Sequence, residues 1–163
     1  MPGVPRELAE HKLDLNPGSN LVKQRLQRFL PDKKAAIKKE ITKLLVAEFI
    51  REILHPDWLA NPILIQKKNS KEWRMRLNYI DLNKHCLKDP FGLTHIDQII
   101  DSMVGSALLS FLDCYLGYHQ IALRKEDQSK TSFITLFGAY SYMTMSFRLK
   151  TPVQPISGLS RHA

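Results

Sequence analysis

The stretch Leu108–Ile121 reads Leu-Leu-Ser-Phe-Leu-Asp-Cys-Tyr-Leu-Gly-Tyr-His-Gln-Ile. Its first five residues are almost continuously apolar, which is the pattern of a strand buried on both faces of a sheet. Asp113 follows directly, and a carboxylate at the end of a buried strand is costly unless it is paired, hydrogen-bonded or bound to a cation. Mg²⁺ prefers such oxygen ligands. Two interpretations of Asp113 stay open on this evidence: a metal ligand, or a cap for the turn at Gly117.

The composition is that of a basic globular protein. The sequence has 163 residues, a hydrophobic fraction of 44% and a formal net charge of +8. Such a charge favours nucleic acid before a membrane surface, although a merely soluble basic protein is the alternative. No apolar run reaches the ~20 residues of a membrane span, and the first residues lack the apolar core of a signal peptide. Cys86 and Cys114 lack metal-site spacing, so we expect reduced thiols in an intracellular protein.

The N-terminal part divides into a lead-in and a basic helix. Residues 1–22 contain three prolines and no sustained period, and they are predicted to be extended. Residues 21–43 hold eight basic and two acidic side chains, a net +6. Asp32 is predicted as the N-cap of a helix that runs to about Ile50. Its lysines fall mostly on one face, which is either a solvated surface or a track for a phosphate backbone. The opposite, apolar face is predicted to hold Ile37, Ile41, Leu44, Leu45 and Phe49.

Two hairpins are predicted from alternating and β-branched segments. The first joins Ile63–Lys68 to Glu72–Tyr79, with basic side chains near its tip. Those side chains could bind a triphosphate. The alternative is that their charge merely keeps an edge hairpin soluble. The second joins Lys130–Phe137 to Ala139–Met145 around Gly138.

The segment between the hairpins is predicted to contain a loop and a helix. Asp81 to Pro90 is predicted as a loop. Thr94 and Asp97 have the spacing of a capping box, which predicts a helix that ends at Gly105. His85, Cys86 and Asp89 are close in sequence but lack the spacing of a zinc site. His119 is predicted to be a packing or surface residue rather than a base.

Many separate motifs, in the same order, resemble the reverse transcriptase of gypsy-type long-terminal-repeat retrotransposons. The similarity covers roughly residues 1–150, and Met1–Pro5 resembles the family's joint between protease and polymerase. The motifs are Trp73–Met75, Asp81–Asn83, Lys88–Pro90, Ile96–Gln98, Ser110–Tyr115, Gly117–Ile121, Lys130–Thr131 and Phe137–Tyr140.

The resemblance implies an α+β fold, with residues 23–90 as fingers and 91–150 as a partial palm of a right-hand polymerase. It also implies an RNA-directed DNA polymerase that acts on a template-primer and a deoxynucleoside triphosphate. In the intact family two Mg²⁺ ions stabilise the attacking and leaving oxygens. Asp113 matches the family's first metal-binding, catalytic aspartate.

The resemblance further assigns nucleotide-binding residues. Arg74 matches the arginine over the incoming triphosphate, and either Lys67 or Lys68 matches its lysine partner. Tyr118 matches the aromatic gate whose ring crowds a ribose 2′-hydroxyl. Phe147 lies in the segment that borders the nucleotide in the family.

The sequence also departs from the family. The paired aspartates that supply the remaining metal ligands are missing, because these 163 residues contain no Asp-Asp pair. We therefore expect a truncated polymerase that is inactive alone. Asn78 stands where the family has Asp, Ser70 replaces a turn glycine, and Cys114 replaces a leucine. Arg148 replaces a glycine that lies close to the nucleotide, which adds bulk where the backbone must approach.

Residues 151–163 do not resemble the family. Deleting one base from a family-like Lys-Asn-Ala-Gly-Ala-Thr-Tyr-Gln-Arg coding segment gives the residues of Lys150–Gly158, so we hypothesise an out-of-frame tail. If restoring one base near codon 151 does not reopen a frame that reaches the paired aspartates, this hypothesis fails. The alternatives for the whole chain are a non-catalytic nucleic-acid-binding remnant and a pseudogene product with no selected function. The last of these predicts poor solubility.

Overall fold

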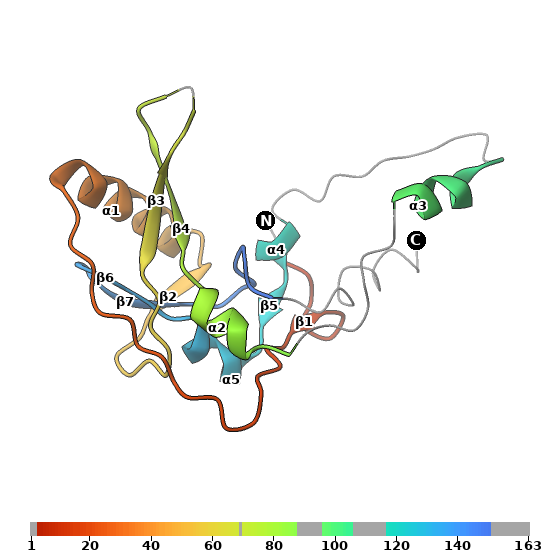
Figure 1. Cartoon of the computed structure of the whole chain (residues 1–163), viewed down its shortest axis with the longest axis horizontal. Coiled ribbons are helices and arrows are strands. Elements are labelled where there is room, and N and C mark those ends of the chain that lie inside the picture. Colours follow the sequence, from red (N-terminus) through yellow and green to blue (C-terminus); the bar gives the residue numbers. More distant parts are fainter. Residues whose placement is uncertain (1–2, 69, 88–95, 106–116, 151–163) are drawn as a thin grey trace.

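The computed structural model describes residues 3–68, 70–87, 96–105 and 117–150, which form a mixed α/β structure (Figure 1). Its central sheet is antiparallel with the strand order β2-β7-β6. The three strands are β2 (Ile50–Glu52), β6 (Phe133–Thr135) and β7 (Gly138–Tyr142). The predicted second hairpin is thus confirmed, although its strands are shorter than predicted and Gly138 opens β7 instead of standing between the strands.

The first predicted hairpin is also confirmed. β3 (Pro62–Gln66) pairs antiparallel with β4 (Trp73–Leu77), and Gln66 lies opposite Trp73 at the tip end. The base of this hairpin is bonded to the central sheet through Ala60. The Ala60 amide donates to the Ser132 carbonyl over 2.9 Å, and the Ala60 carbonyl accepts from the Ile134 amide over 2.9 Å. The hairpin therefore stands on the edge of the sheet, as Figure 1 shows.

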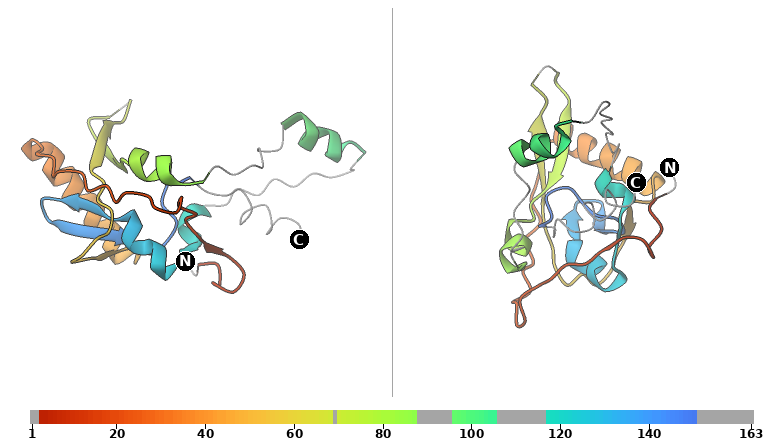
Figure 2. Two further views of the ribbon diagram at one scale, coloured as in Figure 1. Left: turned by 60° about the horizontal axis from the view of Figure 1, so that its bottom comes forward. Right: turned by 90° about the vertical axis from the view of Figure 1, so that its right-hand side faces the viewer.

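Helix α1 (Pro31–Val46) packs beside β4, and both Figure 1 and Figure 2 show the two elements side by side. The predicted cap is wrong, because Pro31 opens the helix and Asp32 lies within the first turn. Proline suits this position, since its fixed φ is helical and its missing N–H would be unpaired there anyway. The predicted end is also wrong, because Ile50 is already the first residue of β2.

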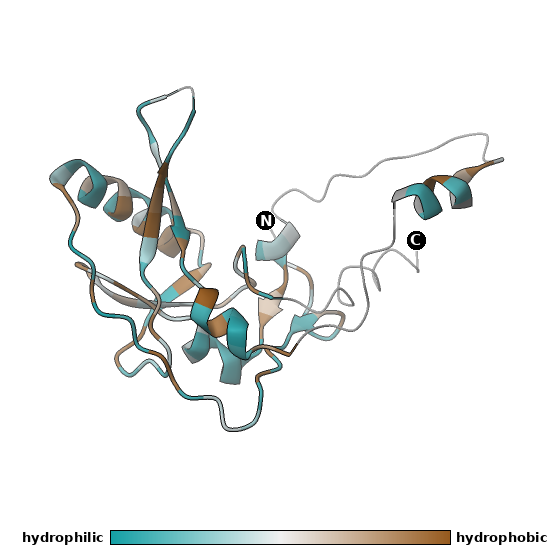
Figure 3. Ribbon diagram, in the orientation of Figure 1, coloured by the Kyte–Doolittle hydropathy of each residue, from teal (hydrophilic) through white to brown (hydrophobic). Residues whose placement is uncertain are grey.

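The apolar face of α1 is confirmed in part. The buried residues of the helix are Ile37, Ile41 and Leu44, whereas Leu45 is 39% exposed and Phe49 lies beyond the helix end. The first turns are hydrophilic, as the colouring of Figure 3 shows.

The predicted loop from Asp81 is wrong, because α2 (Ile80–His85) is helical. The side chain of Asn78 accepts a hydrogen bond from the Ile80 amide over 3.3 Å, and Leu82 is buried in the core. A short helix held by one buried leucine has too few periodic positions to be recognised from sequence. The predicted helix before Gly105 is confirmed as α3 (Ile96–Met103), and Gly105 has a φ of +91°. Thr94, its predicted first residue, lies outside the described residues.

Short elements follow residue 116. They are α4 (Gly117–Gln120), β5 (Ala122–Leu123), α5 (Lys125–Gln128) and the 3₁₀ turn Ser129–Thr131. The strand predicted over Leu108–Leu112 and the cysteine Cys114 lie outside the described residues.

The N-terminal segment is tied to these short elements. Within it, β1 (Glu10–His11) pairs in parallel with β5. The Leu13 amide donates to the carboxylate of Asp127 over 3.0 Å, and the Leu87 amide donates to the Asp14 carbonyl over 2.8 Å. The segment predicted as an extended lead-in therefore contributes a strand and buried side chains to the fold.

One core joins α1, both hairpins and α2. Phe133 lies at its centre with no exposed surface, and its ring centroid is 5.8 Å from that of Tyr140 and 6.0 Å from that of Tyr142. Cys86 is a free, buried thiol in this core. Among the described helices, none combines the length and the apolar character that crossing a membrane requires.

His11 gives the fold a predicted acid sensitivity. Its side chain is fully buried, and within the described residues neither ring nitrogen has a hydrogen-bond partner. Burial lowers the pKa of His11, while the carboxylates of Asp127 and Asp14 oppose this in part. The folded state therefore binds the proton less tightly than the unfolded state, whose histidine pKa is about 6.5.

Stability is expected to be complete above that pH and to fall below it, by up to about 1.4 kcal/mol per pH unit. The His11→Leu variant should lack this component, as measured by urea unfolding between about pH 7 and pH 5. His119 has a pKa lowered by burial too, but it is present in both proteins and cancels in the comparison. Equal pH slopes for the two proteins would contradict the prediction.

Candidate functional site

A cavity of about 390 Å³ lies where α1, β4 and the segment after β7 meet. No two of these elements are adjacent in the chain, so the fold creates the cavity. Its walls combine cationic, aromatic and apolar side chains. The lining residues are Glu40, Leu44, Arg74, Met75, Arg76, Leu77, His119, Tyr142, Ser146 and Phe147.

Strand β4 brings two guanidinium groups to this cavity. Arg74 is exposed, whereas Arg76 is half-buried and lies 5.7 Å from the centre of the Phe147 ring. Within the described part of the chain, neither arginine has a carboxylate within ion-pair distance. Glu40 is the acidic residue of the lining. Two arginines without an ion-pair partner make this wall suitable for a phosphate, which guanidinium groups bind in a bidentate manner.

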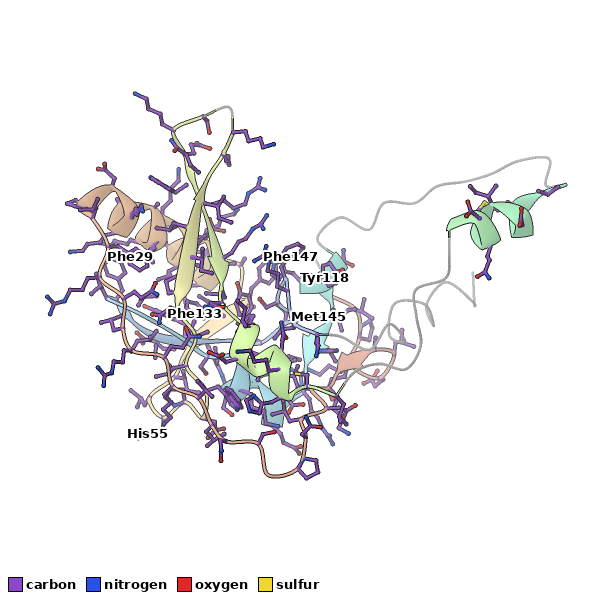
Figure 4. All side chains as sticks on the ribbon, in the orientation of Figure 1. Phe29, His55, Tyr118, Phe133, Met145 and Phe147 are labelled. Carbon is purple, nitrogen blue, oxygen red and sulfur yellow. The ribbon has the colours of Figure 1, made fainter. Side chains whose placement is uncertain are left out.

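Two exposed aromatic rings stand at the mouth of the cavity. Tyr118 and Phe147 are 44% and 55% exposed, and their rings meet edge to face with centroids 6.1 Å apart. Figure 4 shows the two side chains next to one another, although they come from α4 and from the segment after β7. Tyr118 therefore does not line the cavity itself, but it contacts Phe147, which does. Such rings offer apolar faces to a sugar or a base.

His119 is an uncharged part of the cavity lining and packs against two aromatic rings. Its ring stacks on Phe49 with centroids 4.6 Å apart and lies parallel to Tyr142 at 6.0 Å. Burial lowers the pKa of His119 and raises the pKa of Tyr142 to about 12, so both are neutral near pH 7. The prediction that His119 packs is confirmed.

The hairpin lysines lie apart from this cavity. Lys67 forms an ion pair with Glu72, and this contact lowers the pKa of the Glu72 carboxyl. Lys67 lines a separate groove of about 420 Å³ between α1 and the hairpin, and Lys68 is exposed. Of the nucleotide-binding residues predicted from sequence, the structure thus brings together Arg74, Tyr118 and Phe147 but not Lys67 or Lys68.

The predicted metal ligand, Asp113, lies outside the described residues. Among the residues that are described, no three His, Cys, Asp or Glu side chains gather in a way that would hold a metal ion.

Arg148 occupies a backbone conformation that favours glycine. Its φ is +73°, a left-handed value that costs a side-chain-bearing residue roughly 1–2 kcal/mol. Asn83 secures the turn, since its Nδ2 donates to the Arg148 carbonyl over 2.8 Å and its Oδ1 accepts from the Lys150 amide over 2.9 Å. The departure from the glycine of the family pattern is therefore a strained position that two hydrogen bonds support.

Sequence reasoning missed several lining residues. Arg76 follows Arg74 at the two-residue spacing of one strand face, so this signal was available. Tyr142 is the last residue of β7, and no local pattern reveals the pairing of β7 with β2. Ser146 follows in the segment after β7.

Comparison with known proteins relates the chain to parts of much longer polyproteins. No family model matches it. The retrovirus-related Pol polyprotein from transposon 412 of Drosophila melanogaster is 38% identical over 93 residues, which are 54% of this chain and 8% of that protein. The transposon Tf2-3 polyprotein of Schizosaccharomyces pombe is 31% identical over 121 residues, 74% of this chain and 9% of that protein. The enzymatic polyprotein of cauliflower mosaic virus is 26% identical over 153 residues, 91% of this chain and 22% of that protein.

A solved structure has the same fold. The crystal structure of the prototype foamy virus protease-reverse transcriptase superposes with a TM-score of 0.73 at 18% identity, over 94% of this chain and 21% of that one. The chain spans less than a quarter of the length of each of these proteins. It is a distant homologue of a short segment of transposon polyproteins, and it shares the fold of part of the foamy virus protease-reverse transcriptase.

Proposed function

We propose that this chain is a fragment of a gypsy-type retrotransposon reverse transcriptase, an RNA-directed DNA polymerase by descent. Residues 23–90 correspond to fingers and residues 91–150 to a partial palm of a right-hand polymerase. The homology to Pol polyproteins and the fold shared with a protease-reverse transcriptase support this assignment.

The cavity beside β4 is proposed as the site for the incoming deoxynucleoside triphosphate. The observation that carries this proposal is that Arg74 and Phe147, two predicted nucleotide contacts from distant parts of the sequence, line one cavity. Arg74 and Arg76 would bind the phosphates, and the rings of Phe147 and Tyr118 would face the sugar. Tyr118 would then crowd a 2′-hydroxyl and favour deoxynucleotides.

The metal chemistry would involve Asp113 alone among the residues of this chain. Bound Mg²⁺ would supply charge stabilisation for the phosphoryl oxygens. Because the 163 residues contain no Asp-Asp pair, we propose that this polypeptide binds substrate but does not by itself transfer nucleotides.

Replacing Arg74 by Ala tests the proposed triphosphate site. Charge-assisted hydrogen bonds contribute about 1.5–3 kcal/mol, so Arg74→Ala is expected to weaken binding of a fluorescent deoxynucleoside triphosphate about 10- to 100-fold. Arg51→Ala is the matched control, because Arg51 is an exposed arginine on β2 that does not line the cavity. Equal losses in both variants would mean that the nucleotide responds only to net charge, and the cavity assignment would fail.

A non-catalytic nucleic-acid-binding remnant is the second candidate function. The observation that favours it is the exposed lysine face of α1, together with the net charge of +8. Phosphate contacts predict that such binding weakens steeply as salt is raised.

A further inference from the structure

The outer face of α1 carries lysines that form no ion pair with a carboxylate of the described residues. The helix holds five lysines against Asp32 and Glu40, a net +3. Elsewhere Lys12, Lys67, Lys84 and Lys130 each form an ion pair with a carboxylate. Within the described residues, no such ion pair involves the exposed lysines of α1. These exposed lysines are Lys34, Lys38, Lys39 and Lys43.

The spacing of these lysines sets them in two rows. Lys34 and Lys38 are four residues apart, and so are Lys39 and Lys43, so each pair lies along one line of the helix surface. Like charges at this spacing destabilise a helix by a few tenths of a kcal/mol. Between the rows lie Ala35 and Thr42, which are small and exposed. The helix thus presents two parallel cationic rows with a shallow strip between them.

Aromatic rings flank both rows. The Lys38 ammonium lies 6.0 Å from the ring centre of Phe137, which is 40% exposed in the turn between β6 and β7. On the other side, the groove between α1 and the first hairpin contains Lys39, Lys43 and the ring of Trp73. The Lys33 ammonium also lies over the Trp73 ring, 4.8 Å from the ring centre. Two hairpins therefore place one aromatic side chain on each side of the lysine face.

This combination discriminates between classes of polyanion. Lysine rows bind phosphates of any origin, but exposed rings add stacking energy only for bases that are free of a duplex. An anionic membrane would call for an apolar helix face, but Ile37, Ile41 and Leu44 of α1 are buried in the core. Its exposed large apolar side chains are Leu45 and Val46, at the C-terminal end of the helix, and they form no continuous stripe along it.

We propose that the outer face of α1, with Phe137 and Trp73 at its sides, binds single-stranded nucleic acid. This surface is separate from the triphosphate cavity. The inference rests on the proposed nucleic-acid-binding role of the chain. In a polymerase fragment of this kind, its ligand would be an unpaired stretch of strand and not the paired template-primer.

The test measures binding of the full chain to a fluorescent 12-nucleotide oligo(U) by anisotropy at several salt concentrations. The surface variant carries Lys38→Gln, Lys39→Gln and Lys43→Gln, substitutions that preserve helix propensity. The charge-matched control carries Lys12→Gln, Lys84→Gln and Lys125→Gln, at exposed positions outside α1. Because each phosphate contact contributes about 0.7 to the slope of log affinity against log salt, the surface variant should lose about 2 from that slope. The control should keep the wild-type slope.

A second pair of variants tests the stacking. Phe137→Ala is expected to weaken oligo(U) binding about tenfold. Leu136→Ala removes a neighbouring side chain of nearly the same exposure, 41%, and should leave the affinity unchanged. A 12-base-pair RNA duplex should bind more weakly than oligo(U), and its affinity should not respond to Phe137→Ala.

The outcomes separate the two proposals. A wild-type chain that binds no nucleic acid would overturn both the nucleic-acid role and this surface. If the wild-type chain binds oligo(U) and both lysine variants lose the same affinity, the nucleic-acid-binding role stands. The proposal that the outer face of α1 is the binding surface is then overturned. Equal binding of duplex and oligo(U), with no effect of Phe137→Ala, would overturn the preference for single strands. Binding to phosphatidylserine vesicles that competes with oligo(U) equally well would assign the face to anionic surfaces in general and overturn the proposal.

Discussion

Replacing Phe133 by Ala is expected to lower the free energy of unfolding by about 3–5 kcal/mol. Phe133 has no exposed surface, and its ring contacts those of Tyr140 and Tyr142. Its truncation would leave a cavity between the central sheet and the base of the first hairpin. At this base, the backbone of Ala60 forms hydrogen bonds with Ser132 and Ile134, the two neighbours of Phe133 in the chain. Domains of this size have unfolding free energies of about 5–15 kcal/mol, so much of the chain should unfold at 37 °C.

Urea unfolding followed by far-ultraviolet circular dichroism measures this loss. Phe147→Ala is the matched control, because that ring is 55% exposed and its removal should change stability by less than about 0.5 kcal/mol. The same control variant should weaken nucleotide binding, since Phe147 lines the cavity. If both variants unfolded at the same urea concentration, the core assigned to Phe133 would be wrong.

The wild-type curve in the same experiment bears on the pseudogene hypothesis. A product with no selected fold should be poorly soluble and should unfold without a sharp transition. A monodisperse chain with one cooperative transition would argue against that hypothesis.

How much of the fold follows from sequence depends on the range of the interactions involved. The two hairpins and α1 were predictable, because a period of two or of 3.6 residues extends over enough positions to be read. Helix α2 was not, since it is short and depends on the burial of Leu82 among distant residues. The pairing of β1 with β5 could not be predicted either, because only two residues of each strand take part.

The candidate site divides in the same way. Arg74 and Phe147 were predicted through resemblance to a family, and the fold places them around one cavity. The ion pair of Lys67 with Glu72 was not predicted, and Lys67 lines a separate groove instead of that cavity. Arg148 was predicted to bring bulk where the family has glycine, and its φ of +73° gives that departure a measurable backbone cost. The gathering of Arg74 and Phe147 depends on long-range geometry, which no local pattern encodes, whereas the other two differences arise within one hairpin and at one residue.

The purified 163-residue chain is expected to extend no primer, even with Mg²⁺ and all four deoxynucleoside triphosphates present. Two-metal transfer needs several carboxylates to hold both ions, and Asp113 is the one catalytic aspartate that this sequence matches to the family. A single carboxylate leaves the ions short of ligands and leaves the charge of the triphosphate largely uncompensated.

The measurement compares extension of a labelled DNA primer on an RNA template by the wild-type chain and by its Asp113→Asn variant. Both should give the background of a reaction without protein, while both still bind the fluorescent nucleotide through Arg74. If the chain binds the nucleotide but does not extend the primer, its inactivity is due to the missing metal ligands and not to unfolding. Extension by the wild-type chain that disappears in Asp113→Asn would show that one carboxylate suffices, and the physical reason for inactivity would then be wrong.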